Sequence, residues 1–142
     1  MAFSAEQPEG YLTVLSTDAP EQPLVTPPSP PVANANMLSF SPDGAKLVVS
    51  YGRGNGDNGH LAIRNAVTGD VEAELDPATL GIGVKKLFMP EWSPLGREIV
   101  AVAATTDERP WSVNDGSIVV FRYEDGRFGH GEVLVPATSA LS

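Results

Sequence analysis

The sequence contains no cysteine and few basic residues. Without cysteine the chain cannot form a disulfide, a thiolate metal site or a cysteine nucleophile. Its 9 Lys and Arg residues are outnumbered by 18 Asp and Glu residues, which gives a formal net charge of −9. Nucleic acids and anionic membrane surfaces are bound through clustered basic side chains, so this balance argues against both as partners.

Long hydrophobic runs are also missing. The longest, Ile99 to Ala104, is far shorter than the roughly 18 residues that a membrane-spanning helix needs. The sequence therefore predicts no membrane span. Residues 1–10 lack the basic start and apolar stretch of a secretory signal peptide, so we expect either a cytoplasmic protein or a chain whose true start is missing.

Glycine and proline, in contrast, are plentiful. The 14 Gly and 13 Pro residues accompany an ordinary apolar fraction of 42%, which favours a folded chain with many turns over a disordered one. Helical periodicity is absent along the whole sequence. We therefore predict an all-β protein.

An internal repeat organises the chain. The segment Phe40 to Val48 aligns with Trp92 to Val100, 52 residues later, and each contains an aromatic residue, Ser-Pro-x-Gly, two spacers and an aliphatic pair. Proline and glycine at these positions fit a type I turn, so each copy predicts a hairpin between two strands. An alternating apolar segment, a glycine-containing turn and a last short strand follow each copy, with the turns at 67–70 and 124–127 and the last strands at 71–75 and 133–135.

Each copy thus predicts a meander of four short strands. This pattern resembles the blade signature of TolB-like β-propellers, which are related in pattern to WD-repeats, and the resemblance covers roughly Met37 to Val135. It implies four-stranded antiparallel meander blades of a β-propeller, and it suggests a periplasmic or cell-envelope location. Leu95 departs from the aspartate that is usual in the turn. Propellers serve many activities, so the resemblance implies no particular one.

The repeat also predicts the domain organisation. About two and a half blades form an incomplete ring, because closed propellers typically have four to eight. We therefore expect a fragment of a larger propeller, or self-association through the uncovered end blades. The predicted segments are the outer half of a preceding blade (1–25), a proline-rich linker (26–36), a first full blade (37–75), a connector (76–86), a second full blade (87–135) and a tail (136–142).

Three loops are expected on one face of the blades, at residues 52–59, 76–86 and 105–116. Long loops on a rigid scaffold often bind ligands. The last loop mixes charge with a large aromatic side chain, as recognition surfaces for a protein or small ligand do, through Asp107, Glu108, Arg109, Trp111 and Asp115. The alternative is that Trp111 packs beneath its own loop while the charges face water.

The first loop carries oxygen ligands that could hold calcium, namely Asn55, Asp57 and Asn58. It lacks the EF-hand spacing, however, and a flexible Gly/Asn turn is the favoured interpretation, so we expect no cofactor. His60 and His130 are the only histidines. Neither lies in a metal-binding motif, and we expect both at the surface.

The sequence contains no motif of a catalytic nucleophile. We therefore predict a non-catalytic β-propeller module for binding or scaffolding, with an unknown ligand. The alternative is that these blades are an accessory propeller of a larger hydrolase or other enzyme.

Overall fold

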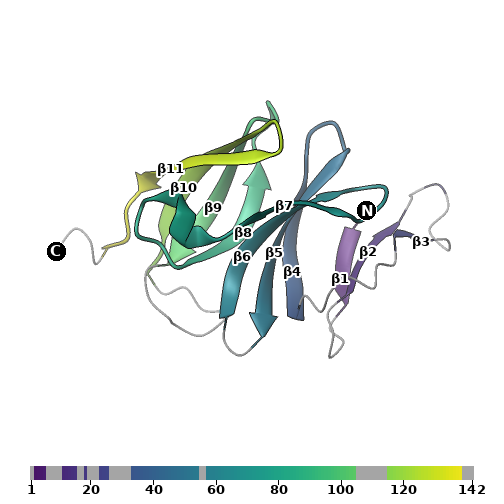
Figure 1. The fold of residues 1–142 in the computed structure, drawn as a ribbon, viewed down its shortest axis with the longest axis horizontal. Coiled ribbons are helices and arrows are strands. Elements are labelled where there is room, and N and C mark those ends of the chain that lie inside the picture. The colour runs from purple at the N-terminus through teal and green to yellow at the C-terminus, as the bar shows by residue number, and fades with distance from the viewer. Residues whose placement is uncertain are drawn as a thin grey trace.

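The computed structural model describes residues 2–5, 11–15, 18, 23–25, 33–54, 57–104 and 115–138. Most of these residues lie in antiparallel strands (Figure 1), which confirms the all-β prediction. The N-terminal sheet consists of three strands, β1 (Ala2–Ala5), β2 (Tyr11–Leu15) and β3 (Pro23–Val25).

Two further sheets contain four strands each, and in both the strands follow one another as an antiparallel meander, as the repeat predicts. The first contains β4 (Ala33–Phe40), β5 (Lys46–Gly54), β6 (Asp57–Asn65) and β7 (Val71–Leu75). The second contains β8 (Lys86–Trp92), β9 (Glu98–Ala104), β10 (Ser117–Glu124) and β11 (Arg127–Val135). A 3-10 turn, η1 (Pro77–Leu80), lies in the connection between them. Strand β4 begins within the stretch predicted as a proline-rich linker, and its pairing with β5 is irregular between Ala33 and Met37.

The Ser-Pro-x-Gly segments form equivalent turns. In the first, Gly44 N donates to Ser41 O over 2.8 Å; in the second, Gly96 N donates to Ser93 O over 2.9 Å. Both glycines have positive φ, 72° and 74°, a conformation in which a side chain is strained. The sequence repeat therefore encodes one turn geometry twice, as predicted.

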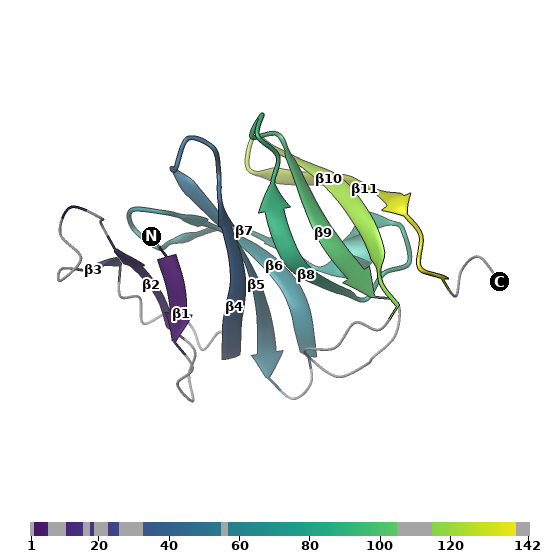
Figure 2. The same ribbon diagram turned by 180° about the vertical axis from the view of Figure 1, so that it is seen from behind.

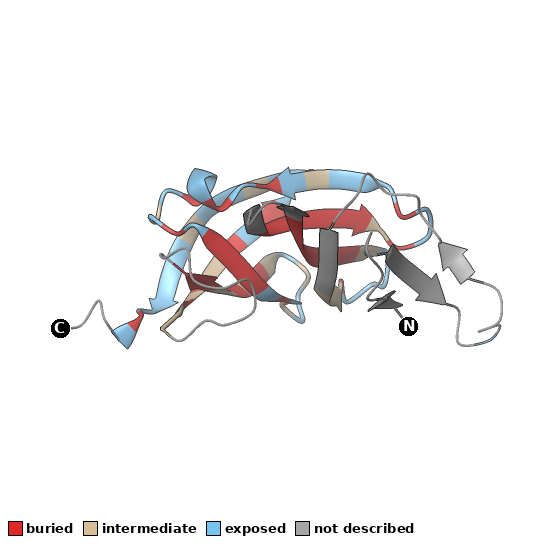
Figure 3. Cartoon of the chain, turned by 90° about the horizontal axis from the view of Figure 1, so that it is seen from below, coloured by how far each residue is buried: buried red, intermediate tan, exposed pale blue. Residues whose placement is uncertain are grey.

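The main core lies between the two four-stranded sheets. The first sheet contributes Val48, Leu61 and Ile63, and the second contributes Ile99 and Phe121 among others, all fully buried. The opposite face of the first sheet carries its own buried cluster, which includes Leu47, Val49, Tyr51 and Ala62. Figure 3 shows exposed residues gathered along the outer strands β7 and β11.

The first strands of the three sheets, β1, β4 and β8, lie near one another. Trp92 N in β8 donates to Ser39 Oγ in β4 over 3.3 Å, and Met89 N lies 3.3 Å from Met37 Sδ. On the other side β1 contacts β4, beside which it lies in Figures 1 and 2. Hydrogen bonds and contacts thus place β1, β4 and β8 in succession.

The continuous apolar runs of the sequence predict strands that are covered on both faces; this expectation needs correction for β9, as does the expected exposure of His60. The run Leu47 to Val49 is covered on both faces, as its continuous apolar sequence predicts, but in β9 only Ile99, Ala101, Ala103 and Ala104 are buried. Val100 and Val102 are half-buried, and they alternate along β9 with Ile99, Ala101 and Ala103, which face the main core. His60 is not a surface residue either: it is 6% exposed in β6, where its ring lies 5.7 Å from that of Tyr51.

Candidate functional site

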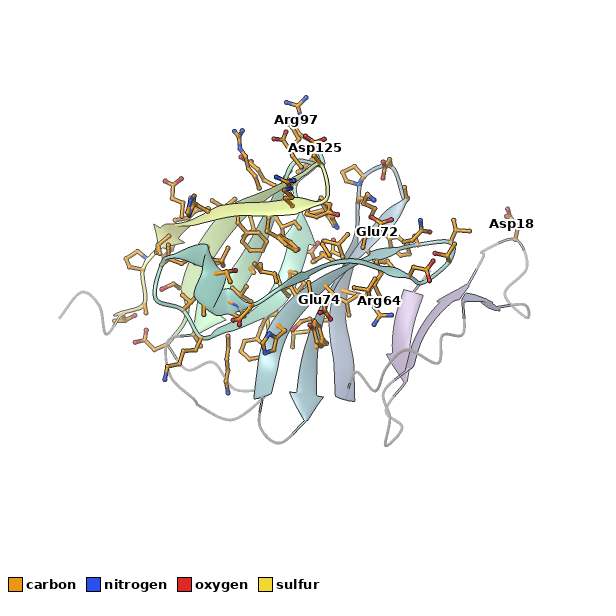
Figure 4. All side chains as sticks on the ribbon, in the orientation of Figure 1. Asp18, Arg64, Glu72, Glu74, Arg97 and Asp125 are labelled. Atoms are coloured by element: carbon orange, nitrogen blue, oxygen red, sulfur yellow. The ribbon has the colours of Figure 1, made fainter. Side chains whose placement is uncertain are left out.

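A cavity of about 530 Å³ lies where the hairpin turns of the two four-stranded sheets meet. Pockets of this size hold small organic ligands. Figure 4 labels two of the residues that line it, Asp125 in the turn between β10 and β11 and Glu72 on β7. The lining residues come from the β4–β5, β8–β9 and β10–β11 hairpins and from the outer strand β7, and they are Ser41, Pro42, Asp43, Lys46, Glu72, Trp92, Leu95, Gly96, Tyr123, Glu124, Asp125 and Gly126.

The first repeat turn supplies one carboxylate. Asp43 Oδ1 accepts hydrogen bonds from Ser41 Oγ at 2.6 Å and from Ala45 N at 3.0 Å. These bonds, that from Ser41 first, lower the pKa of the Asp43 carboxyl below its ordinary value, because both stabilise the ionised form. Asp43 therefore carries its negative charge at neutral pH.

An ion pair crosses the sheet beside this turn. Lys46 Nζ on β5 donates a hydrogen bond to Glu72 Oε2 on β7, and Asn65 Nδ2 on the intervening strand lies 3.4 Å from Glu72 Oε1. The bond to Glu72 raises the pKa of Lys46 above its ordinary value. The side chains of Lys46 and Glu72 remain 35% and 27% exposed, so both can still contact a ligand.

Two aromatic side chains form the inner wall. The rings of Trp92 and Tyr123 are 5.9 Å apart in an edge-to-face arrangement, and Phe128 packs against Tyr123 at 5.1 Å. Burial raises the pKa of the Tyr123 phenol, so at neutral pH it is uncharged. Trp92 is 9% exposed, and its buried indole Nε1 has no hydrogen-bond partner among the described residues.

The last hairpin supplies two more carboxylates. Asp125 and Gly126 form its tight turn with φ of 52° and 75°, the pair of positive φ values that a type I′ hairpin turn requires. Glu124 and Asp125 are exposed beside the opening. Together with Asp43 they leave the cavity acidic, since Glu72 is already paired with Lys46.

A second polar cluster lies on the far face of the first sheet, where Tyr51 packs. Tyr51 Oη donates to Glu74 Oε1 over 3.0 Å. Arg64 is 3% exposed and donates to Gly69 O over 3.1 Å. Burial lowers the pKa of Arg64. These bonds satisfy buried polar groups, and Arg64 anchors the β6–β7 turn.

Most of the residues predicted from the sequence as a binding surface lie outside the described ranges, namely Asp107, Glu108, Arg109 and Trp111. Asp115 is described: its Oδ1 accepts a hydrogen bond from Thr138 N over 2.6 Å, and nearby Ser117 Oγ accepts one from Ala137 N over 3.0 Å. Asp115 therefore holds the tail against the start of β10.

The suggested calcium ligands fall in the β5–β6 hairpin. Asn55 lies outside the described residues, and for Asp57 and Asn58 only the backbone, at the start of β6, is described. Among the side chains that are described, no three His, Asp or Glu residues come together as a metal site.

The sequence repeat places Asp43 in a hairpin turn, Trp92 at the start of the second copy and Glu124 in a later turn, but it does not predict the cavity between them. It could not pair Lys46 with Glu72, which are 26 residues apart and two strands removed. One signal was available: hairpins of successive meanders end on the same side, so their turn residues are expected together.

No protein-family model matches the chain, and no curated protein has a matching sequence. Within the described ranges there is also no helix of the length and hydrophobicity needed to cross a membrane.

Proposed function

We propose that the protein is a non-catalytic scaffold for binding, built of stacked blades of a β-propeller. The supporting observation is the way in which the two four-stranded sheets pack. In the repeat alignment Leu47 corresponds to Ile99 and Val49 to Ala101, yet Leu47 and Val49 face away from the second sheet while Ile99 and Ala101 face the first. Non-equivalent faces are therefore in contact.

Such a contact is open-ended. Two sheets related by a twofold axis would bury equivalent faces, and no further sheet could then add through that contact. Head-to-tail packing leaves one face of each kind uncovered, so further sheets can add until a ring closes or a filament forms. The register of the strands makes Ile63 equivalent to Val120, because they pair with Val48 and Val100 respectively. Ile63 is fully buried against the second sheet, while Val120 is half-buried.

The face of β9 and β10 that contains Val120 is turned away from the first sheet. We propose that a further sheet of the same repeat packs on it. The face presents Val100, Val102, Ile118 and Val120. The equivalent face of the first sheet already holds such a sheet. For the isolated chain this partner is a second copy, so the face makes the chain self-associate.

Light scattering tests this proposal. We expect the wild-type chain to show a mass above the monomer value of 14.9 kDa, rising with concentration, and Val120→Lys to return it towards the monomer, because a buried unpaired charge opposes docking. Val67→Lys is the matched control, since Val67 is 65% exposed in the β6–β7 turn. A stable monomer for the wild type would refute the open stack.

A non-catalytic role fits what the polar side chains do within the described part of the chain. His60 packs on Tyr51, Asp115 binds the tail, and Lys46 binds Glu72. These contacts are structural, and the binding surface that remains is the cavity between the hairpins.

A further inference from the structure

The cavity at the hairpin end combines three properties that select one kind of ligand. It is large enough for a small organic group, at about 530 Å³. Its opening is acidic, with Asp43, Glu124 and Asp125 against a single ammonium, Lys46, which Glu72 already neutralises. An anion is therefore repelled and a cation attracted.

The inner wall favours an organic cation over a metal ion. Trp92 and uncharged Tyr123 line it, and aromatic rings attract ammonium and guanidinium groups through their electron-rich faces while packing against the attached alkyl chain. A small hard cation would instead need several converging oxygens. Within the described residues no such group of carboxylates or histidines occurs.

We propose that this cavity binds an alkylammonium group, with the amine near the carboxylates of Glu124 and Asp125 and the alkyl chain against Trp92 and Tyr123. The inference deepens the proposed binding role and names the chemistry of its ligand. Free polyamines and the lysine side chains of peptides carry this same group. Arg97, labelled beside Asp125 in Figure 4, does not line the cavity.

Trp92 fluorescence provides the test. The chain has 2 Trp residues, so the Trp111→Phe variant reports on Trp92 alone. We expect saturable changes in its emission with putrescine and with N-acetyl-lysine methylamide, and none with neutral butanediol. Tighter binding of putrescine would identify a free polyamine as the source, and tighter binding of the lysine amide a peptide; either order supports the proposal.

A matched pair of variants in the same background locates the site. Replacing Glu124 by Gln together with Asp125 by Asn removes two exposed charges at the opening, and we expect the affinity for the amine to fall roughly fivefold or more. Asn tolerates the positive φ of residue 125. Glu132→Gln, which changes an exposed carboxylate on β11 outside the cavity, should leave the affinity unchanged.

Three results would overturn the inference: no saturable response to either amine, an equal response to butanediol, or the same affinity in both variants. Circular dichroism confirms that each variant is folded. The scattering mass is measured on the same samples, so a failure of amine binding is distinguished from a failure of the stacked-blade proposal.

Discussion

Single residues decide how strongly each repeat turn is held. Asp43 closes the first turn by accepting bonds from Ser41 Oγ and Ala45 N. Leu95 occupies the same position in the second turn, where its side chain is 86% exposed and can accept nothing. The serine stabilises the turn in both copies. Ser41 Oγ accepts a hydrogen bond from Lys46 N, and Ser93 Oγ accepts one from Glu98 N.

Leu95→Asp should therefore stabilise the protein. The new carboxylate would accept equivalent hydrogen bonds from Ser93 Oγ and Arg97 N, as Asp43 does from Ser41 Oγ and Ala45 N, and an exposed apolar side chain would be removed. We expect the free energy of unfolding in urea to rise by about 0.5 kcal/mol. Leu95→Asn, which offers a neutral acceptor, should give a smaller gain; a destabilised Asp variant would contradict the equivalence of the turns.

We expect the protein to lose stability in alkaline solution because of Tyr123. Burial raises the pKa of its phenol above the ordinary 10.0, so the folded state holds this proton more tightly than the unfolded state. The resulting stability is fully present below pH 10 and is lost as the pH rises through the folded pKa. We expect the wild-type free energy of unfolding, from urea titrations, to fall above about pH 10.

Tyr123→Phe separates this contribution from that of Lys46. The pKa of Lys46 is raised from 10.5 by Glu72, which gives a loss of stability in the same direction. The variant should therefore lose stability with a shallower slope than the wild type does. Identical slopes would mean that Tyr123 contributes nothing.

At the scale of elements, the approach of β6 to β8 depends on one glycine. Gly59 has φ of 87°, and a Cβ there would lie 2.6 Å from Lys86 Cβ and 2.9 Å from Lys86 Cα. An added methyl group must therefore push the second sheet away from the first. By contrast, a Cβ at Gly44 meets nothing within 4 Å.

Gly59→Ala and Gly44→Ala form a matched pair. Both place a side chain at positive φ, which costs roughly 1–2 kcal/mol, but only Gly59→Ala adds a backbone clash. We expect a loss of unfolding free energy of about 3 kcal/mol or more for Gly59→Ala, measured by urea denaturation. Equal losses would show that β6 and β8 do not approach as described.

At the scale of the whole molecule, the shared core couples the two four-stranded sheets. Phe121 is 1% exposed and packs with residues of both sheets. Phe121→Ala should cost about 3–5 kcal/mol, and because the core is shared, strand content by circular dichroism and Trp fluorescence should decrease in one transition. Separate transitions would show that the sheets unfold independently.

The sequence by itself determined the strand order and the hairpins, because these depend on neighbours in the chain. The alternation of apolar residues and the Ser-Pro-x-Gly turns specify two meanders without reference to the rest of the molecule. His60 shows the limit of such reasoning: it is buried, with its ring beside that of Tyr51 in the neighbouring strand, whereas its sequence context predicts a surface residue.

Only the tertiary structure decided which faces are covered and where a cavity lies. Leu47 to Val49 and Ile99 to Val102 are similarly apolar in sequence, but one strand is covered on both faces and the other on one. The cavity likewise joins Lys46, Glu72 and Tyr123 from two sheets. Burial and electrostatics depend on residues that are distant in the chain and close in space, so they follow from the packing of the sheets.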